Sequence, residues 1–97
     1  MIEGTMVFRR CRDVRYRIVG AEAVVVRQSG PEVLVLNGVG ARVIEGVDAK
    51  TTVAALVARL AEEYDVDPQT LERDVTSFLS ELAEGGVVEK MEAGDVG

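Results

Sequence analysis

The stretch that most constrains the fold runs from residue 32 to residue 47, where an apolar run passes into a helical pattern without a linker. β-Branched residues and leucine after a Gly30-Pro31 breaker predict a strand over residues 32–36. Asn37 is expected to cap the following helix, because its side-chain oxygen can accept a backbone N–H of the first turn. A sheet must therefore meet a group of helices at this joint. The apolar residues at helical spacing are Val39, Val43, Ile44 and Val47.

Two apolar segments before the joint predict the rest of the sheet. Val14, Tyr16 and Ile18 alternate with polar neighbours, which indicates a half-buried strand, and residues 23–28 form a second, valine-rich segment. Short turns between neighbouring strands favour antiparallel pairing. We therefore expect a three-stranded meander with the strand at residues 32–36 on one edge, where its outer backbone N–H and C=O groups stay unpaired.

Helix signals dominate the chain after residue 50. Either threonine of the Thr51-Thr52 pair can cap a second helix, and the Asp67-Pro68 pair marks the start of a third. The third helix is expected to end at Gly85-Gly86, because glycine readily takes the left-handed conformation, and Val87-Val88 would add a short final strand. The two apolar stripes comprise Val53, Leu56, Val57, Leu60 and Tyr64, and Leu71, Val75, Phe78, Leu79 and Leu82.

Together these patterns predict one α+β domain, with a three-stranded antiparallel sheet followed by a three-helix bundle in a winged-helix-turn-helix-like arrangement. The chain has 97 residues, enough for one small core. Residues 1–12 are expected to be a flexible N-terminal arm and residues 91–97 a disordered tail, which leaves residues 13–90 as the folded domain.

Composition argues against several kinds of chemistry. The chain has no histidine and one cysteine, Cys11, which argues against a zinc site and removes the usual general base. No catalytic constellation, P-loop or metal-ligand spacing is visible, so we expect no enzymatic activity and no cofactor. Gly38-x-Gly40 lacks the third glycine of a dinucleotide site and indicates close backbone packing instead. Arginine neighbours would lower the pKa of the Cys11 thiol, although an incidental thiol is the simpler interpretation.

The sequence also lacks membrane and export signals. No apolar run approaches the ~20 residues that cross a bilayer. The segment from Met1 to Val7 has no basic-then-apolar design, and a single cysteine fits a reducing compartment. We expect a cytoplasmic protein with no membrane partner.

Charge is distributed unevenly along the chain. The net charge is −6, yet residues 1–30 carry six arginines against three acids, whereas residues 61–97 carry eleven acids against Arg73 and Lys90. A winged-helix nucleic-acid-binding regulator would read DNA with its third helix, and it stays the alternative function. Phosphate contacts require positive charge, whereas this helix carries four acids against Arg73. The acids of the helix are Glu72, Asp74, Glu81 and Glu84.

A third interpretation is that the chain is a purely structural subunit of a larger enzyme.

Three motifs in this order resemble the PqqD family. They are Val33-Leu34-Val35-Leu36-Asn37, then Thr52-Val53-Ala54-Ala55-Leu56, then Asp74-Val75-x-x-Phe78-Leu79-x-x-Leu82. The resemblance covers about residues 14–90. The chain departs from the family at Asp48-Ala49-Lys50-Thr51, where members often have Asp-Gly before the threonine.

The resemblance implies a recognition function rather than catalysis. PqqD-like domains are small cytoplasmic domains that bind the leader of a ribosomally made precursor peptide along the third strand and against the third helix. They present it to a modifying enzyme, often a radical SAM enzyme, and the founding member serves pyrroloquinoline quinone (PQQ) synthesis. The edge strand also leaves room for a homodimer. By position, the peptide-binding residues would be Val33, Leu34, Val35, Leu36, Asn37, Arg73, Asp74, Ser77, Phe78 and Glu81, with Phe78 equally a core residue.

Overall fold

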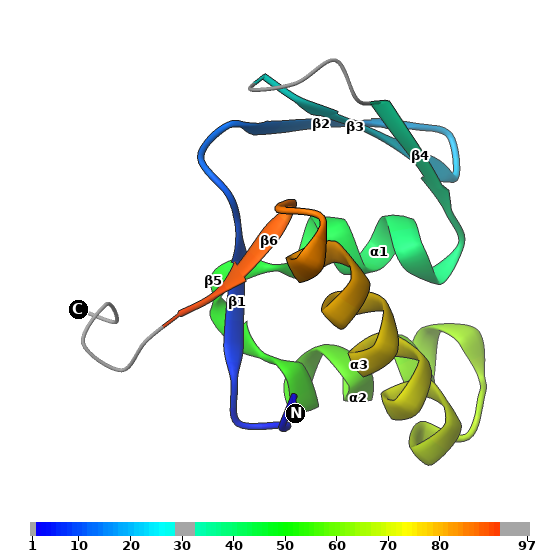
Figure 1. The fold of residues 1–97 in the computed structure, drawn as a ribbon. Helices are drawn as coiled ribbons and strands as arrows, with labels where there is room; N and C mark the ends of the chain where they lie inside the picture. The colour runs from blue at the N-terminus through cyan, green and yellow to red at the C-terminus, as the bar shows by residue number, and fades with distance from the viewer. Residues whose placement is uncertain (1, 29–32, 92–97) are drawn as a thin grey trace.

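The computed structural model describes residues 2–28 and 33–91, and it shows a mixed α+β fold with three helices and two antiparallel sheets (Figure 1). The α+β class predicted from the sequence is confirmed, while the likeness to a winged helix stays a prediction. The elements are β1 (Val7–Arg10), β2 (Val14–Val19), β3 (Glu22–Arg27), β4 (Val33–Asn37), α1 (Val39–Gly46), β5 (Asp48–Thr52), α2 (Val53–Tyr64), α3 (Pro68–Glu84) and β6 (Val88–Lys90).

The first sheet is the predicted meander, with strand order β2-β3-β4 and β4 at one edge. The register pairs Tyr16 with Val25 and Val25 with Leu34, so the inward side chains of all three strands share one face. Figure 1 shows this sheet lying across α1. Ala23 and Val25 are buried beneath it, because the inner face packs on the helices.

The second sheet was not predicted, and it corrects the expectation of a loose arm. Residues 7–10 form β1, which pairs antiparallel with β5 on one side and β6 on the other. The Phe8 side chain is only 4% exposed and belongs to the core. The pattern was missed because β1 is four residues long and its partners lie far away in the chain. The expected tail lies outside the described residues, apart from Met91.

Strand β5 occupies the segment in which we expected only a turn and a helix cap. Asp48 organises its start, because one carboxylate oxygen accepts the backbone N–H groups of Lys50 and Thr51 at 2.9 and 2.8 Å. These hydrogen bonds lower the pKa of the Asp48 carboxyl group, and the one from the Thr51 backbone N–H has the larger effect. Ala49 lies in the left-handed region, with a φ of 68°. Ala49 therefore stands where family members often have glycine, and it keeps the left-handed conformation that glycine favours.

Two of the three predicted helix caps are confirmed and one is wrong. Thr52 accepts the N–H of Ala55 at 3.1 Å to cap α2, and Asp67 accepts the N–H of Thr70 at 3.3 Å to cap α3. Asn37 does not cap α1, because it is the last residue of β4 and the cap position falls on Gly38, which makes no side-chain bond. The chain there requires a φ of 54°, which suits glycine.

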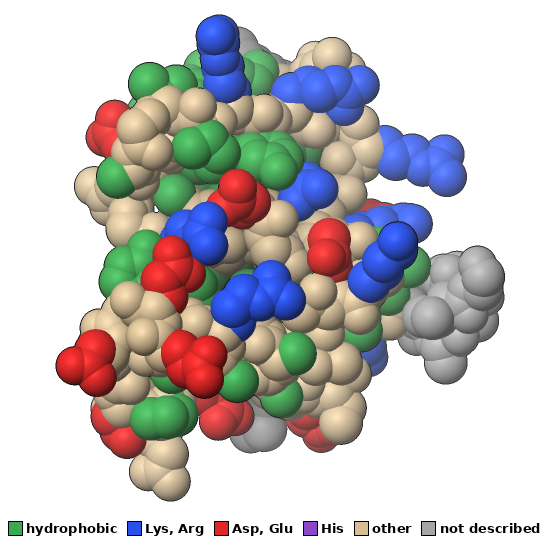
Figure 2. Space-filling view, turned by 180° about the vertical axis from the view of Figure 1, so that it is seen from behind, with side chains coloured by type: hydrophobic (Ala, Val, Ile, Leu, Met, Phe, Trp, Pro, Cys, Tyr) green, Lys and Arg blue, Asp and Glu red, His purple; other side chains and the backbone are tan. Residues whose placement is uncertain are grey.

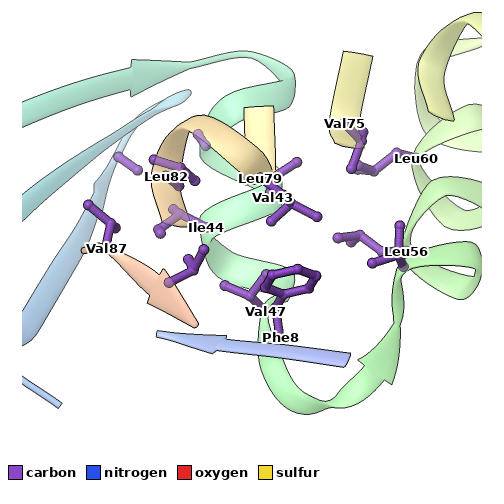
Figure 3. Packing of buried hydrophobic residues seen from close by; sticks show 14 of the residues in the cluster. Phe8, Val43, Ile44, Val47, Leu56, Leu60, Val75, Leu79, Leu82 and Val87 are labelled. Atoms are coloured by element: carbon purple, nitrogen blue, oxygen red, sulfur yellow. The ribbon is translucent and has the colours of Figure 1, made fainter. Parts of the chain in front are cut away.

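The core lies where α1 meets the two other helices and both sheets. Figure 3 shows Val75 of α3 against Leu60 of α2, and Phe8 of β1 beside Val47 after α1. Val43, Ile44 and Leu79 are completely buried. Tyr64, expected in the core, is 37% exposed, because it ends α2 and lies at the rim of a shallow cavity that Ile18 also lines. Phe78 is half-buried.

Replacing the Phe8 side chain tests whether β1 is part of the fold. Phe8→Ala should lower the free energy of unfolding by about 3–5 kcal/mol, because it leaves a cavity in the core. Urea denaturation followed by circular dichroism measures this, with Phe8→Leu as a milder variant and Thr5→Ala as the exposed control. Equal midpoints for Phe8→Ala and Thr5→Ala would show that residues 7–10 do not contribute to stability.

Removing the Asp67 cap should weaken α3. Asp67→Ala leaves the N–H of Thr70 without its acceptor, so we expect a loss of about 0.5–2 kcal/mol in the free energy of unfolding. Glu62→Ala is the matched control, because it removes an exposed helical carboxylate that caps nothing. A chemical denaturation midpoint that is the same in both variants contradicts the capping role.

Candidate functional site

Strand β4 presents an open backbone edge next to α3. It pairs with β3 through Leu34 opposite Val25 and Leu36 opposite Ala23, and within the described residues no strand pairs with its other side. Its five residues carry no charge. Such an edge has outward N–H and C=O groups that can pair with another extended chain.

Two cavities lie between this edge and α3, and together they form what we call the β4–α3 groove. One has a volume of about 300 Å³ and the other about 330 Å³. Leu36 and Phe78 line both cavities, so the Phe78 ring stands between them. The first cavity is further lined by Val35, Asn37, Val39, Gly40 and Asp74, and the second by Leu34, Glu81, Leu82, Gly85 and Val87.

The Phe78 ring packs directly on the first turn of α1. A Cβ atom at Gly40 would lie 3.2 Å from the ring's Cζ atom and 3.6 Å from the Cβ atom of Leu36. Glycine at position 40 therefore lets the ring and β4 approach α1 closely, as the Gly38-x-Gly40 pattern indicated. Phe78 is both a contact of the core and a wall of the groove, and its contact with a peptide stays a prediction.

The structure brings together seven of the ten site residues predicted from the sequence. Val33, Arg73 and Ser77 are exposed but line neither cavity. Five further lining residues were not predicted from the sequence, namely Val39, Gly40, Leu82, Gly85 and Val87. Only the glycine pattern signalled one of them; the others come to the groove through helix and strand packing. The seven are Leu34, Val35, Leu36, Asn37, Asp74, Phe78 and Glu81.

The rim of the groove is acidic. Asp74 lines one cavity and Glu81 the other, and both side chains are exposed. Neither carboxylate makes an ion pair or a hydrogen bond with another described residue. An extended chain in the groove would therefore meet an apolar floor and two free negative charges.

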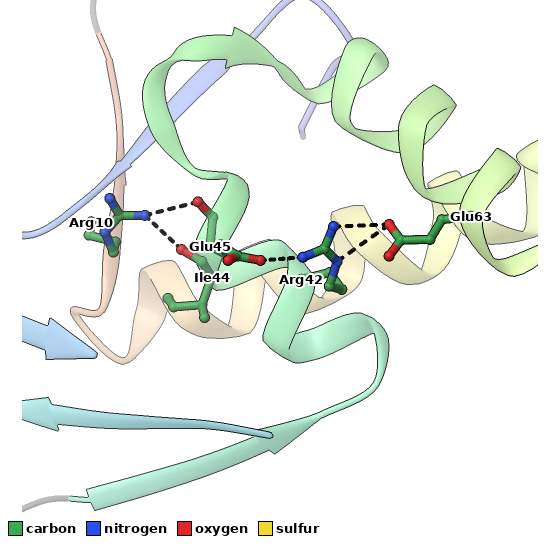
Figure 4. Close-up of polar contacts among 5 residues, drawn as sticks. All are labelled: Arg10, Arg42, Ile44, Glu45 and Glu63. Carbon is green, nitrogen blue, oxygen red and sulfur yellow. Dashed lines mark hydrogen bonds and ion pairs between the residues drawn. The ribbon is translucent and has the colours of Figure 1, made fainter. Parts of the chain in front are cut away.

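Two arginines hold α1, the floor of the groove, against its neighbours (Figure 4). Arg10 of β1 donates to the backbone oxygens of Ile44 and Glu45 at 2.8 and 3.3 Å, which satisfies carbonyl groups of the last turn. Arg42 pairs with Glu45 within α1 and with Glu63 of α2 at 3.1 Å. These bonds fix the position of α1 more than they add stability, because exposed ion pairs contribute little.

The described residues contain no group of three or more histidine, cysteine, aspartate or glutamate side chains that could hold a metal ion. Across the same part of the chain, no helix is both long enough and apolar enough to cross a membrane.

Comparison with protein families gives one match. A family model described as "Coenzyme PQQ synthesis protein D (PqqD)" matches residues 22–88, which run from the start of β3 to the start of β6. No curated protein sequence matches the chain.

Solved structures of similar fold include two that exceed 25% identity. A structure described as TbiB1 in complex with the TbiA(beta) leader peptide is 26% identical, with a TM-score of 0.77, and the match covers 84% of this chain and 94% of that one. The PqqD truncation of Methylobacterium extorquens PqqCD, described as a functional and stand-alone RiPP recognition element, is 28% identical, with a TM-score of 0.75, and the match covers 92% of this chain and 95% of that one.

A third structure supports the fold alone. Lasso peptide synthetase B1 complexed with the leader peptide is 22% identical to this chain, with a TM-score of 0.76, and the match covers 84% of this chain and 96% of that one.

Cys11 lies outside the groove, and its surroundings correct the expected direction of its pKa shift. Burial raises the pKa of the thiol, and so does the Glu89 carboxylate, to which Sγ donates at 3.6 Å. The Arg27 guanidinium lowers it by less. The Asp13 carboxylate also raises the pKa of the thiol. The thiol is therefore less reactive than an exposed one.

Alkylation of Cys11 should be slow in the folded protein. The pH at which the iodoacetamide rate reaches half its maximum should be higher for the folded chain than for the chain in urea, because the raised pKa reduces the thiolate fraction. Glu89→Gln should shift the midpoint to lower pH, while Glu84→Gln, away from the thiol, should leave it unchanged. A folded-state midpoint below that of the unfolded chain would reverse the assignment.

Proposed function

The chain belongs to the PqqD family, and from that premise we propose that it binds the leader of a ribosomally synthesised precursor peptide and presents it to a modifying enzyme. The observation that carries this proposal is the open β4 edge beside the β4–α3 groove. The similar structures whose descriptions name a leader peptide or a recognition element support it.

The leader adds to β4 as a further strand. Its backbone pairs with the N–H and C=O groups of every second residue of β4, either Leu34 and Leu36 or Val33, Val35 and Asn37, which supplies affinity with little dependence on side chains. Because strand side chains alternate, every second leader residue enters the groove beside Phe78. Val33 and Asn37 extend the edge at its two ends.

Charge selects the leader's composition. Asp74 and Glu81 at the rim favour basic residues in the leader, and Arg73 and Ser77 lie on the exposed side of α3, where they contact the leader outside the cavities. The acids of α3 likewise disfavour the alternative of a nucleic-acid-binding regulator, because phosphates would be repelled.

The chain itself carries out no covalent step in this proposal. The modifying enzyme, of which a radical SAM enzyme is one candidate, acts on the presented peptide in the synthesis of PQQ or a related peptide-derived product. The proposed setting is the cytoplasm. Pairing of two chains through β4 would occupy the same edge, so a homodimer and the peptide complex would exclude each other.

Titration with a synthetic leader should perturb the groove. The probe is a synthetic leader, the N-terminal half of a candidate precursor peptide, and the measurement is the change in amide chemical shifts of the labelled protein. Shifts should concentrate on residues 33–40 and 71–87, because these carry the edge and the cavities. Shifts confined to residues 9–17, with the groove untouched, would show that the groove is not the binding site.

Proline and salt separate backbone pairing from charge in this titration. Of Leu34 and Val35, one N–H faces the leader and the other pairs with β3, so proline is placed at each in turn. The variant that stays folded has lost the outward N–H and should bind at least about tenfold more weakly. Val35→Thr keeps the N–H and the side-chain shape, so it is the matched control. Affinity should fall as salt rises, less steeply in a variant carrying Asp74→Asn and Glu81→Gln.

A further inference from the structure

The meander has an outer face that points away from α1, and this face is unusually apolar. The register places side chains in rows across the three strands, with Arg15, Val26 and Val33 in one row. A second row holds Arg17, Val24 and Val35. We call these six residues the outer sheet face.

Three of the four valines of this face are exposed to water, and Val24 is half-buried. Val33 is 58% exposed, Val35 59% and Val26 38%. A meander with one solvated face normally carries polar residues there, and grouped exposed apolar side chains mark interaction sites. In Figure 1 no described helix or strand lies over this side of the sheet.

Charge on the face is positive and confined to one side. Arg15 and Arg17 stand on β2 and are exposed, whereas β4 contributes only uncharged residues. Arg15 donates to backbone oxygens of Arg12 and Val14, and neither Arg15 nor Arg17 pairs with a carboxylate of the described residues. Figure 2 shows arginine and lysine side chains projecting from the upper edge of the molecule, while acids gather toward the lower left.

We propose that the outer sheet face docks the modifying enzyme, through an enzyme surface that is apolar opposite the valines and acidic opposite Arg15 and Arg17. The proposal rests on the proposed function and adds the surface through which presentation occurs. A second copy packed face to face with β2 opposite β2 would bring the arginines of both copies together, which disfavours that arrangement.

Continuity with the groove gives the docking surface its use. A leader strand added at β4 continues the sheet, so its outward side chains extend the rows that contain Val33 and Val35. An enzyme seated on the outer sheet face would therefore contact the domain and the bound leader together. This geometry makes the loaded complex a better partner than the empty domain.

Charge reversal on β2 tests the docking surface without touching the leader site. The partner is the purified enzyme that modifies the precursor bearing this leader, and its affinity for the domain loaded with the synthetic leader is measured by calorimetry. Arg15→Glu with Arg17→Glu should weaken enzyme binding at least about tenfold, while leader affinity changes by less than about twofold. Lys50→Glu with Arg59→Glu makes the same change of charge away from the face and should leave both affinities unchanged.

The outcomes distinguish this inference from the function on which it rests. Unchanged enzyme binding by the β2 variant, or its equal loss in the control, overturns the docking surface even if the leader binds. Self-association of the wild-type chain that the β2 variant abolishes, without any enzyme binding, also overturns it. If no leader binds, the proposed function fails, and enzyme binding that depends on Arg15 and Arg17 would then still support the surface.

Discussion

The burial of the apolar face of α1 is the interaction on which the other parts of this structure depend. A helix of eight residues is too short to be stable alone in water. Val43 and Ile44 are completely buried, with the meander on one side and the other two helices on another. This packing fixes the angle between β4 and α3, and so it sets the width of the groove between them. Arg10 and Arg42 then tie the helix to β1 and α2.

Local signals predicted the parts of the fold that local chemistry determines. Thr52 and Asp67 cap helices because each side-chain oxygen lies just before an apolar helical stripe and accepts a backbone N–H of the first turn. Asn37 carried the same signal and failed, since the strand runs one residue further and the backbone at Gly38 takes a conformation in which no side-chain cap forms. Strand β1 could not be predicted in this way, because its stability comes from partners far along the chain.

The candidate site likewise has parts that local sequence predicts and parts that depend on distant packing. The edge strand and the acids of α3 were predicted from strand order, helical spacing and family resemblance. The walls contributed by Val39, Leu82 and Val87 depend on how helices and strands cross, which periodicity does not encode. The charge asymmetry visible in the sequence becomes a spatial one, because the arginines of β2 and the acids of α3 lie on different elements with the groove between them.

Because β1 pairs with β5 and β6, the two sheets differ in the sequence separation of their strands. In the meander each strand pairs with its neighbour in the chain, so little loop-closure entropy is lost. In the other sheet Phe8 lies opposite Lys90, which closes a loop that contains nearly every other element. The contacts of longest sequence separation are therefore found in this small sheet. Its strand β1 also carries Arg10, which donates to the backbone of α1. The position of α1, the floor of the groove, thus depends on a strand whose partners lie far away in the sequence. The β4 edge beside it depends only on pairing between neighbouring strands.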